Sequence, residues 1–427
     1  MSDSLNHARD RDAANPLAPL RNRFHRLPAG RIYLDGNSLG LLSIDAEAAV
    51  LRALDQWKTL GIDGWLEAEP DWFTLGERLG AMMAPLVGAD ADEVVVTGTT
   101  TVNLHSLVST FYQPEGRRRR IVATALDFPS DMYALQSQIA LHGGDPHRDL
   151  LIIPSSDGCT IDEADIIDAM SPDVALVLLP SVLYRSGQLF DIERLAAAGR
   201  ERGIPVGFDC AHSAGAVPHR FSEWGVDFAF WCTYKYLNSG PGGVGALYIH
   251  RRHLHRTPGL TGWWGYLKEK QFDMLHTWEG ARSAGAWQLS TTPVLAGASL
   301  LGSLQIFEEA GIEEIRRQSL DLSTYLIDLL MHSGLTELPY NFGIGTPLAL
   351  ERRGGHVAVE HDHAVQIARA LKARGIVPDY RAPNVIRLAP VALYTTFEDV
   401  WRAVQALKEI IDAGEHLLHD SGRSLVA

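Results

Sequence analysis

Residues 205–218 read PVGFDCAHSAGAVP, an apolar run that ends at Asp209 and continues as a turn of small residues around His212. Residues 230–243 read FWCTYKYLNSGPGG and repeat this arrangement, because an apolar run is followed by Lys235 and a loop rich in Gly, Pro and Ser. Continuous apolar runs of this length are typical of strands buried on both faces. Ligands of open α/β sheets bind at the carboxyl ends of such strands, so both polar turns are candidate site positions.

Further apolar runs alternate with stretches of helical period on both sides of these two. The predicted strands are Glu93–Thr97, Arg120–Ala125, Val174–Leu179, Pro205–Asp209, Asp227–Trp231 and Gly243–His250. The predicted helices between them are Val102–Phe111, Met132–His142 and Ile192–Arg202. Strands that alternate with helices need right-handed crossovers and form a mostly parallel sheet. The sequence therefore predicts an α/β fold with helices on both faces of the sheet.

The pattern changes near Pro293. A long helical stretch, Val294–His332, is followed by strands expected near Leu348–Glu351 and Val385–Leu388 and by helices near His363–Arg374 and Phe397–Ala413. We therefore expect an N-terminal tail at 1–32, a large α/β domain at 33–293, and a linking helix with a smaller α+β domain at 294–427. The polar start of the tail, Met1–Asn15, is expected to be either disordered or laid across another subunit.

The composition restricts the class of protein and its partners. The 427 residues are 46% hydrophobic and 21% charged, which is close to the globular average. The 38 basic and 52 acidic side chains give a net charge of −14, which disfavours nucleic acid as a partner. No run approaches the ~20 apolar residues that span a membrane, and the start lacks an apolar secretion signal. Three scattered cysteines fit a reducing cytoplasm and predict neither a disulfide framework nor a metal site.

Two more strand ends carry polar side chains. Gly98-Thr99-Thr100-Thr101 leads into a helix, where hydroxyls and backbone N–H groups suit a phosphate. An ordinary helix-capping threonine is the alternative interpretation. The loop 126–131, LDFPSD, places Phe128 beside Ser130 and Asp131 after the next strand. A proline-containing turn explains this loop almost as well.

The two loops quoted first add charged groups to this edge of the sheet. A carboxylate at the end of a buried strand is costly unless it pairs with a cation, and Asp209 occupies that position with His212 three residues on. A lysine among apolar and aromatic groups has a lowered pKa and becomes an amine nucleophile, which is the interpretation favoured for Lys235 between Tyr234 and Tyr236. A lysine that reaches solvent from the strand edge is the alternative.

Together, the four strand ends fit one cofactor. Pyridoxal 5'-phosphate requires a phosphate cradle, a stacking aromatic ring, a buried aspartate and a reactive lysine. The lysine forms the Schiff base, and the aspartate keeps the pyridine nitrogen protonated so that the ring can accept electrons. The order of these groups along successive strands supports the prediction independently of any single motif.

Several longer stretches identify a family. They are LDGNSLG (34–40), TTVNLHSL (100–107), DFPSD (127–131), FDCAHSAGAVP (208–218), CTYKYLNSGPGG (232–243), GWWG (262–265) and NVIRLAP (384–390). In these stretches the chain resembles the kynureninases, which are fold-type I members of the aminotransferase superfamily and use pyridoxal phosphate. The resemblance covers nearly everything from Tyr33 to the C-terminal helices. DFPSD and TYKYLNSGPGG are specific to this family, whereas the aspartate and the lysine alone specify only the superfamily.

The resemblance implies a role for each candidate residue. Lys235 would hold the cofactor and move the α-proton, and Asp209 would pair with the pyridine nitrogen. Tyr234 would bind the phosphate and is also a candidate acid or base. Phe128 would stack on the ring, and Arg387 would clamp the substrate α-carboxylate. The other residues expected at the cofactor are Thr100, Thr101, Ser130, Asp131 and His212, with Trp263 and Thr291 from the partner subunit of a homodimer. Ser38 and Trp65 are expected at the substrate.

The implied activity is the hydrolytic β,γ-cleavage of L-kynurenine to anthranilate and L-alanine, in tryptophan catabolism. Trp65 is found at its position in bacterial members, and Thr291 replaces the Asn of animal members, so we expect a preference for L-kynurenine over its 3-hydroxylated form. An aminotransferase or a lyase of the same fold, acting on a different amino acid, is the alternative. A cysteine desulfurase is disfavoured, because it needs a cysteine on a late loop and all three cysteines precede Gly240.

Overall fold

The computed structural model describes residues 4–422, and its centre is a seven-stranded sheet with the strand order β2-β8-β7-β6-β5-β3-β4. These strands are β2 (Val94–Val96), β3 (Arg120–Thr124), β4 (Leu150–Ile153), β5 (Val174–Pro180), β6 (Val206–Asp209), β7 (Phe228–Cys232) and β8 (Gly245–Ile249). Only β8 runs antiparallel to its neighbours within this sheet. The predicted α/β fold with a mostly parallel sheet is confirmed.

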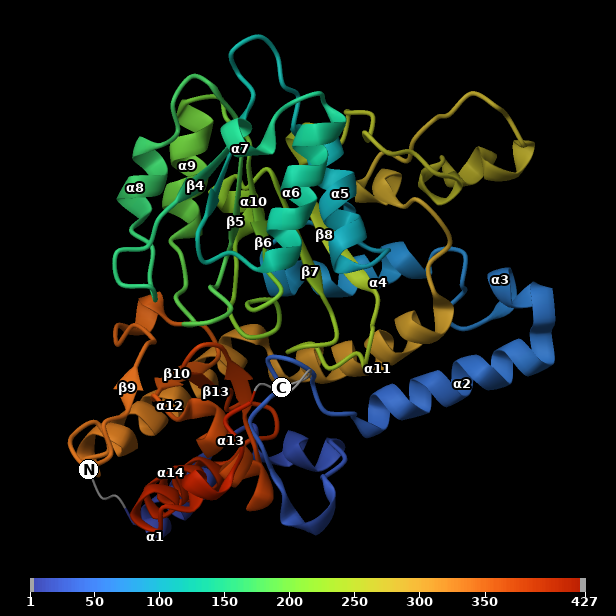
Figure 1. The fold of residues 1–427 in the computed structure, drawn as a ribbon. Helices are drawn as coiled ribbons and strands as arrows, with labels where there is room; N and C mark the ends of the chain where they lie inside the picture. The colour runs from blue at the N-terminus through green and yellow to red at the C-terminus, as the bar shows by residue number, and fades with distance from the viewer. Residues whose placement is uncertain (1–3, 423–427) are drawn as a thin grey trace.

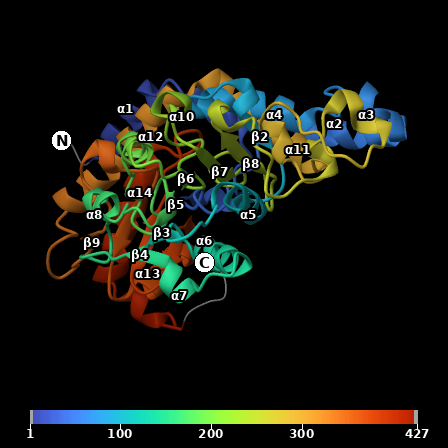
Figure 2. The same cartoon turned by 90° about the horizontal axis from the view of Figure 1, so that it is seen from above.

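Helices cover both faces of this sheet because successive residues of each strand point to opposite sides. Val177 of β5 and Phe208 of β6 belong to the apolar core that includes α4 (Leu75–Met83), α9 (Ile192–Glu201) and α11 (Val294–Ala310). Leu176 and Leu178 of β5 point to the other side, into a core with α5 (Thr100–Phe111) and α6 (Pro129–Leu141). Figure 2 shows the sheet edge-on between these two groups of helices.

The C-terminal part of the chain forms a smaller unit below the carboxyl ends of the large sheet (Figure 1). Its antiparallel sheet has the order β12-β13-β10-β9. The strands are β9 (Gly343–Ile344), β10 (Val357–Glu360), β12 (Asp379–Arg381) and β13 (Val385–Leu388), and the helices are α12 (Ile312–His332), α13 (Ala364–Ala373) and α14 (Phe397–Asp412). This unit has its own apolar core, which supports the α+β architecture expected for it.

Two local predictions in this region were wrong. The strand expected near Leu348–Glu351 is a surface turn in which Leu348 and Leu350 are about half exposed, and the neighbouring strand β10 forms where Val357 and Val359 are buried. The single stretch 294–332 is two helices, because Gly311 ends α11 with a φ of 71° that favours glycine and turns the chain before α12.

The start of the chain packs against its end. Helix α1 (Leu5–Ala14) lies on α14 (Figure 1), and the Asp12 carboxylate accepts hydrogen bonds from the backbone N–H groups of Phe397 (2.9 Å) and Glu398 (3.0 Å). Strand β1 (Ile32–Tyr33) pairs in parallel with β11 (Ile376–Val377). The expectation that residues 1–15 are disordered is therefore wrong for the described part, 4–15, and the alternative expectation, a contact with another subunit, stays a prediction. Within residues 4–422 no helix is long and apolar enough to cross a membrane.

Candidate active site

A cavity of about 220 Å³ lies at the carboxyl ends of β5, β6 and β7, where the small unit meets the large sheet. Its lining contains all of the predicted site residues except three. The residues that it brings together are Ser38, Thr100, Thr101, Phe128, Ser130, Asp131, Asp209, His212, Tyr234, Lys235 and Arg387. The cavity is also lined by Asn37, Tyr184 and Arg381, which were not predicted as site residues from the sequence. Asn37 lies within the quoted LDGNSLG stretch, whereas the other two stand in no motif.

Lys235 follows β7 and projects into this cavity. Its Nζ lies 3.0 Å from Nε2 of His212 and 5.9 Å from the centre of the Phe128 ring. Burial, and then the charge of Lys235, hold the pKa of His212 well below its usual range. The His212 imidazole is therefore neutral and its Nε2 accepts a hydrogen bond from the lysine ammonium group. This contact fixes the amine at the end of β6, next to Asp209.

Two buried carboxyl groups, Asp209 and Asp131, share this end of the sheet. Asp209 ends β6 and is 8% exposed, and one of its oxygens accepts a hydrogen bond from the backbone N–H of Ala211 at 2.8 Å. Burial, and then the charge of Asp209, raise the pKa of Asp131 well above its ordinary value. Burial also raises the pKa of Asp209, and the nearby charge of Lys235 opposes that shift. Two buried carboxyl groups with raised pKa values favour sharing one proton between them. They also favour a protonated nitrogen of a ligand that binds beside them in the cavity.

The part of the cavity at the start of α5 is suited to a phosphate. Helix α5 begins at Thr100, and the side chain of Thr99, its N-cap residue, makes no capping hydrogen bond. The first backbone N–H groups of the helix are therefore left for another acceptor. The Thr101 and Ser130 hydroxyls lie 2.7 Å apart and join α5 to the start of α6. The helix-capping alternative for this threonine run is not supported.

Arg387 is held in the wall of the cavity by β12 and β13. Its side chain is 1% exposed, and it donates hydrogen bonds to the Tyr184 carbonyl oxygen at 2.6 Å and to Ser38 Oγ at 3.1 Å. Its Nε and Nη2 both contact the carboxylate of Asp379, which also accepts from Arg381 Nε at 3.0 Å. One fully buried carboxylate thus fixes two guanidinium groups beside the cavity.

Three predicted residues lie outside this cavity. Trp65 stands on α3 (Gly64–Glu67) and packs against Trp72 and Trp264, with ring centres 5.8 and 5.4 Å away. Trp263 is half exposed on a loop that borders a separate hollow. Thr291 lies in the segment before α11 and is partly buried. The predicted action of Trp263 and Thr291 in the cavity of a partner subunit stays a prediction, as does the predicted place of Trp65 at the substrate.

Several buried polar groups in this cavity fit pyridoxal phosphate. Neither amide atom of the buried Asn37 has a hydrogen-bond partner in the described chain, and His212 Nδ1 is also without one. Unpaired buried groups of this kind are costly and indicate a polar ligand. The amine of Lys235, the carboxyl groups near it and the open start of α5 match the aldehyde, the pyridine nitrogen and the phosphate of this cofactor.

Two solved structures share this fold. The chain superposes on a cysteine desulfurase from Thermococcus onnurineus with a TM-score of 0.76 at 19% identity, covering 92% of this chain and 98% of that one. It superposes equally well, with a TM-score of 0.76 at 22% identity, on a C-DES variant whose cofactor, pyridoxal phosphate, is covalently linked to glycine, covering 91% of this chain and 98% of that one. The fold and the cavity together define a pyridoxal-phosphate-dependent enzyme of fold-type I.

Sequence comparison specifies the family. The chain is 54% identical to a kynureninase from Geobacillus thermodenitrificans over 100% of this chain and 99% of the relative. It is 53% identical to a kynureninase from Bacillus cereus over 99% of this chain and 97% of that relative. Residues 315–407 match the model of the kynureninase C-terminal domain. The chain belongs to the kynureninase family, so the resemblance drawn from its motifs is confirmed.

Proposed function

We propose that this enzyme hydrolyses L-kynurenine between its β-carbon and its γ-carbonyl carbon, giving anthranilate and L-alanine. One water molecule is consumed, its hydroxyl group ending on the carboxyl of anthranilate and a proton on the β-carbon of alanine. The observation that carries this proposal is the meeting of Lys235, Asp209 and Arg387 in one cavity of a chain from this family. The reaction belongs to tryptophan catabolism.

The roles of the side chains follow from their chemistry. When bound, pyridoxal phosphate supplies an electron sink for the carbanion character that develops at the substrate carbon atoms. Asp209, with Asp131 beside it, would hold the proton on the ring nitrogen, and Phe128 would pack against the ring. Arg387 binds the substrate α-carboxylate through its planar guanidinium group. Lys235 is the residue that would hold the cofactor through its amine and then move the α-proton.

Tyr234 is the candidate acid for the addition of water to the γ-carbonyl group. Burial, and then the neighbouring Cys232, raise the pKa of Tyr234, so its hydroxyl stays protonated at neutral pH. A protonated phenol donates a proton or a hydrogen bond to the oxygen of the hydrated carbonyl group. The rest of the phosphate end, Thr100, Thr101 and Ser130, would bind the cofactor without taking part in proton transfer.

A desulfurase-like reaction is not favoured, although Cys232 lines the cavity. Burial is the largest cause of a raised pKa of the Cys232 thiol, which therefore stays neutral and is a poor nucleophile. All three cysteines of the chain are free thiols, which supports a reducing, cytoplasmic location.

The activity is tested with purified enzyme, L-kynurenine and the fluorescence of anthranilate, with Lys235→Ala as the control. Wild type is expected to release anthranilate and the variant to be silent. A wild type that binds the cofactor but releases no anthranilate would favour a transaminase or a lyase that acts on another substrate. The assay run with 3-hydroxykynurenine tests the expected preference for L-kynurenine, and a higher kcat/KM on the hydroxylated form would overturn it.

We also infer a homodimer. Large apolar side chains are exposed along α2 (Ile44–Leu60) and its continuation into α3, which extend away from the body of the molecule (Figure 1). Among them Trp57 is 61%, Ile62 76% and Leu66 74% exposed. A surface this apolar, on a segment that projects from the molecule, supports an interface with a second copy.

Mixed dimers test whether Trp263 acts in the partner's cavity. Lys235→Ala and Trp263→Ala chains are co-expressed with different tags, and the mixed dimer is purified. If Trp263 serves the partner's cavity, one of the two sites in that dimer has both side chains, so about half of the wild-type activity returns. If Trp263 acts only in its own chain, neither site is complete and the mixed dimer stays inactive.

A further inference from the structure

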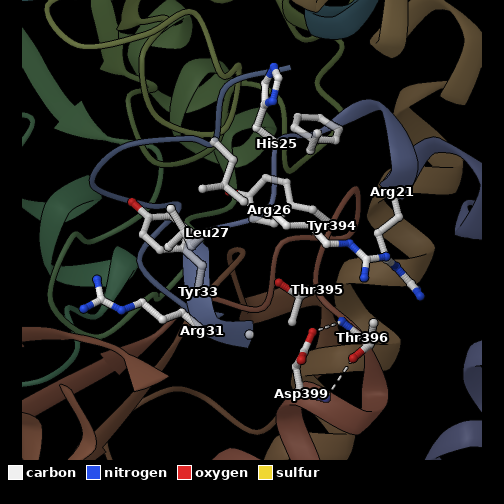
Figure 3. A pocket seen from close by; sticks show the side chains of 13 residues that line it. Arg21, His25, Arg26, Leu27, Arg31, Tyr33, Tyr394, Thr395, Thr396 and Asp399 are labelled. Atoms are coloured by element: carbon white, nitrogen blue, oxygen red, sulfur yellow. Dashed lines mark hydrogen bonds between the residues drawn. The ribbon is translucent and has the colours of Figure 1, made fainter. Parts of the chain in front are cut away.

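A second cavity lies between the N-terminal segment and the small C-terminal unit. Its volume is about 350 Å³, and none of the residues that line it lines the active-site cavity. Segment 21–33 and Leu41 form one side, and residues 394–399, where the chain enters α14, form the other (Figure 3). Nothing in the proposed reaction uses this cavity.

The lining of this second cavity is basic. Arg21, His25, Arg26 and Arg31 contribute to it, against one acidic residue, Asp399. Neither Arg26 nor Arg31 has a hydrogen-bond or ion-pair partner within residues 4–422, and the contact from Arg21 to Asp12 is long, at 3.5 Å. In Figure 3 the guanidinium groups of Arg21 and Arg26 end on one side and that of Arg31 on the other. Arginines without a carboxylate partner at the border of a cavity are suited to an anion.

The acidic groups near this cavity are already engaged. One Asp399 oxygen accepts the Thr396 backbone N–H at 2.9 Å, and Thr396 Oγ1 accepts the Asp399 N–H at 2.8 Å, as the dashed lines in Figure 3 mark. Asp12 caps the next two N–H groups of α14. The start of α14 is therefore satisfied, and Arg26 and Arg31 are left without a carboxylate partner.

A buried hydroxyl group points into the same space. Thr395 is 2% exposed, and its Oγ1 has no hydrogen-bond partner in the described chain. Figure 3 shows its oxygen directed toward the cavity. An unpaired buried hydroxyl destabilises the fold unless a ligand or a water molecule satisfies it, so this atom is a further polar contact for a bound anion.

Aromatic rings form the remaining walls. Phe24 and Tyr394 meet edge to face with ring centres 5.2 Å apart, and the Tyr33 ring lies 6.5 Å from that of Tyr394. Rings arranged in this way accept another flat ring by stacking or by edge contact. We propose that this cavity is a binding site for an aromatic carboxylate. The ring would lie among Phe24, Tyr33 and Tyr394, and the carboxylate would be held by Thr395 and by one of the two unpaired arginines, Arg26 or Arg31.

The location connects this site to the active one. Tyr33 donates a hydrogen bond to the Leu39 carbonyl oxygen at 2.7 Å, and the loop between them carries Ser38, which contacts Arg387. A ligand that bridges Tyr33 and Tyr394 therefore acts on the loop that supports the substrate clamp. Anthranilate is an aromatic carboxylate, so the enzyme's own product is a ligand of the expected class; this last step alone rests on the proposed function.

The test is calorimetric titration of the holoenzyme with benzoate, which needs no turnover. Arg26→Gln/Arg31→Gln is expected to lose one benzoate site per chain or to weaken it by about tenfold or more, because neither unpaired arginine is left to make the charge-assisted contact. Thr395→Val retains the shape without the hydroxyl and is expected to weaken the same site less. Arg117→Gln, an exposed arginine on another loop, is the matched control and keeps the wild-type affinity.

Benzoate binding that is absent, or equal in wild type and both cavity variants, overturns the proposal. Acetate and benzyl alcohol, which supply only the charge or only the ring, are expected to bind at least about tenfold more weakly, and equal binding of either one overturns the ligand class. The proposed function fails separately. An enzyme that releases no anthranilate from L-kynurenine but binds benzoate in the predicted way refutes the function and leaves the cavity proposal standing.

Discussion

Asp379→Asn is expected to weaken substrate binding more than it affects the chemical steps. The carboxylate of Asp379 is fully buried and contacts Nε and Nη2 of Arg387, which is itself 1% exposed. The asparagine retains the volume but removes the charge and one acceptor. Hydrogen bonds to a charged group contribute about 1.5–3 kcal/mol each, and 1.4 kcal/mol is about tenfold in affinity. Loss of one such contact frees the guanidinium group, so KM for L-kynurenine should rise about tenfold to a hundredfold.

The same substitution should also lower stability. Removal of one partner of a buried ion pair leaves the other charge unpaired and costs about 3–5 kcal/mol, and the amide oxygen of asparagine recovers part of this. The matched control is Asp412→Asn, because Asp412 pairs with Lys408 at 2.7 Å on the exposed face of α14. A surface pair of this kind contributes about 0.3–0.5 kcal/mol.

The assay for Asp379→Asn is steady-state anthranilate release over a range of L-kynurenine concentrations, with thermal unfolding measured on the same preparations. The expected pattern is a raised KM, a kcat reduced by a smaller factor and a lowered unfolding temperature, none of which appears in Asp412→Asn. If Asp379→Asn is unfolded, Asp379→Glu, which keeps the charge at a changed distance, gives the same comparison. A KM within twofold of wild type in a folded Asp379→Asn enzyme would show that Arg387 does not depend on this carboxylate.

Three further outcomes are expected. Burial, and then the charge of Asp379, raise the pKa of Asp35 from 3.8 to about 6, so the stability of the fold decreases as the pH rises through this range. Asp35→Asn should therefore stabilise the enzyme at pH ~8 but not at pH ~4. Equal effects of this substitution at the two pH values, measured by urea unfolding, would contradict the prediction. Gly40→Ala should lower cofactor retention, because its Cβ would lie 2.4 Å from the Lys235 carbonyl oxygen, whereas Gly343→Ala, with an ordinary 3.4 Å contact, should retain the cofactor absorbance. Tyr234→Phe should reduce kcat by about a hundredfold, and an unchanged kcat would exclude this hydroxyl as the acid.

The sequence predicted those parts of the site that depend on local order. Asp209 and Lys235 each follow a continuous apolar run, so their placement at the carboxyl ends of neighbouring strands required only the parallel arrangement of the sheet. Phe128 was located in the same way, after the strand that ends at Thr124. In these cases a residue's distance along the chain from a strand end determines its distance from the cavity.

The parts that were missed depend on pairing between distant segments. Arg381 and Asp379 reach the site only because β12 pairs antiparallel with β13, in the register that sets Asp379 opposite Arg387. Tyr184 contributes a backbone carbonyl oxygen, which any residue type supplies. The prediction of a strand at 348–351 was wrong for a related reason. An apolar run indicates burial, but whether it pairs as a strand depends on segments that are distant in the sequence.

The loop 35–40 explains why the start of the chain belongs to the site. Strand β1 pairs with β11 of the C-terminal unit, and Asp35 forms a bridge to Ala389, so the loop enters from that unit. It leaves at Gly40, whose N–H donates to the Tyr234 carbonyl oxygen at 2.8 Å, next to the lysine of the large sheet. Ser38 stands between these two anchors and accepts from Arg387. Any shift of the C-terminal unit relative to the sheet must therefore bend this loop. Bending the loop in turn changes the contact between Ser38 and Arg387, which binds the substrate.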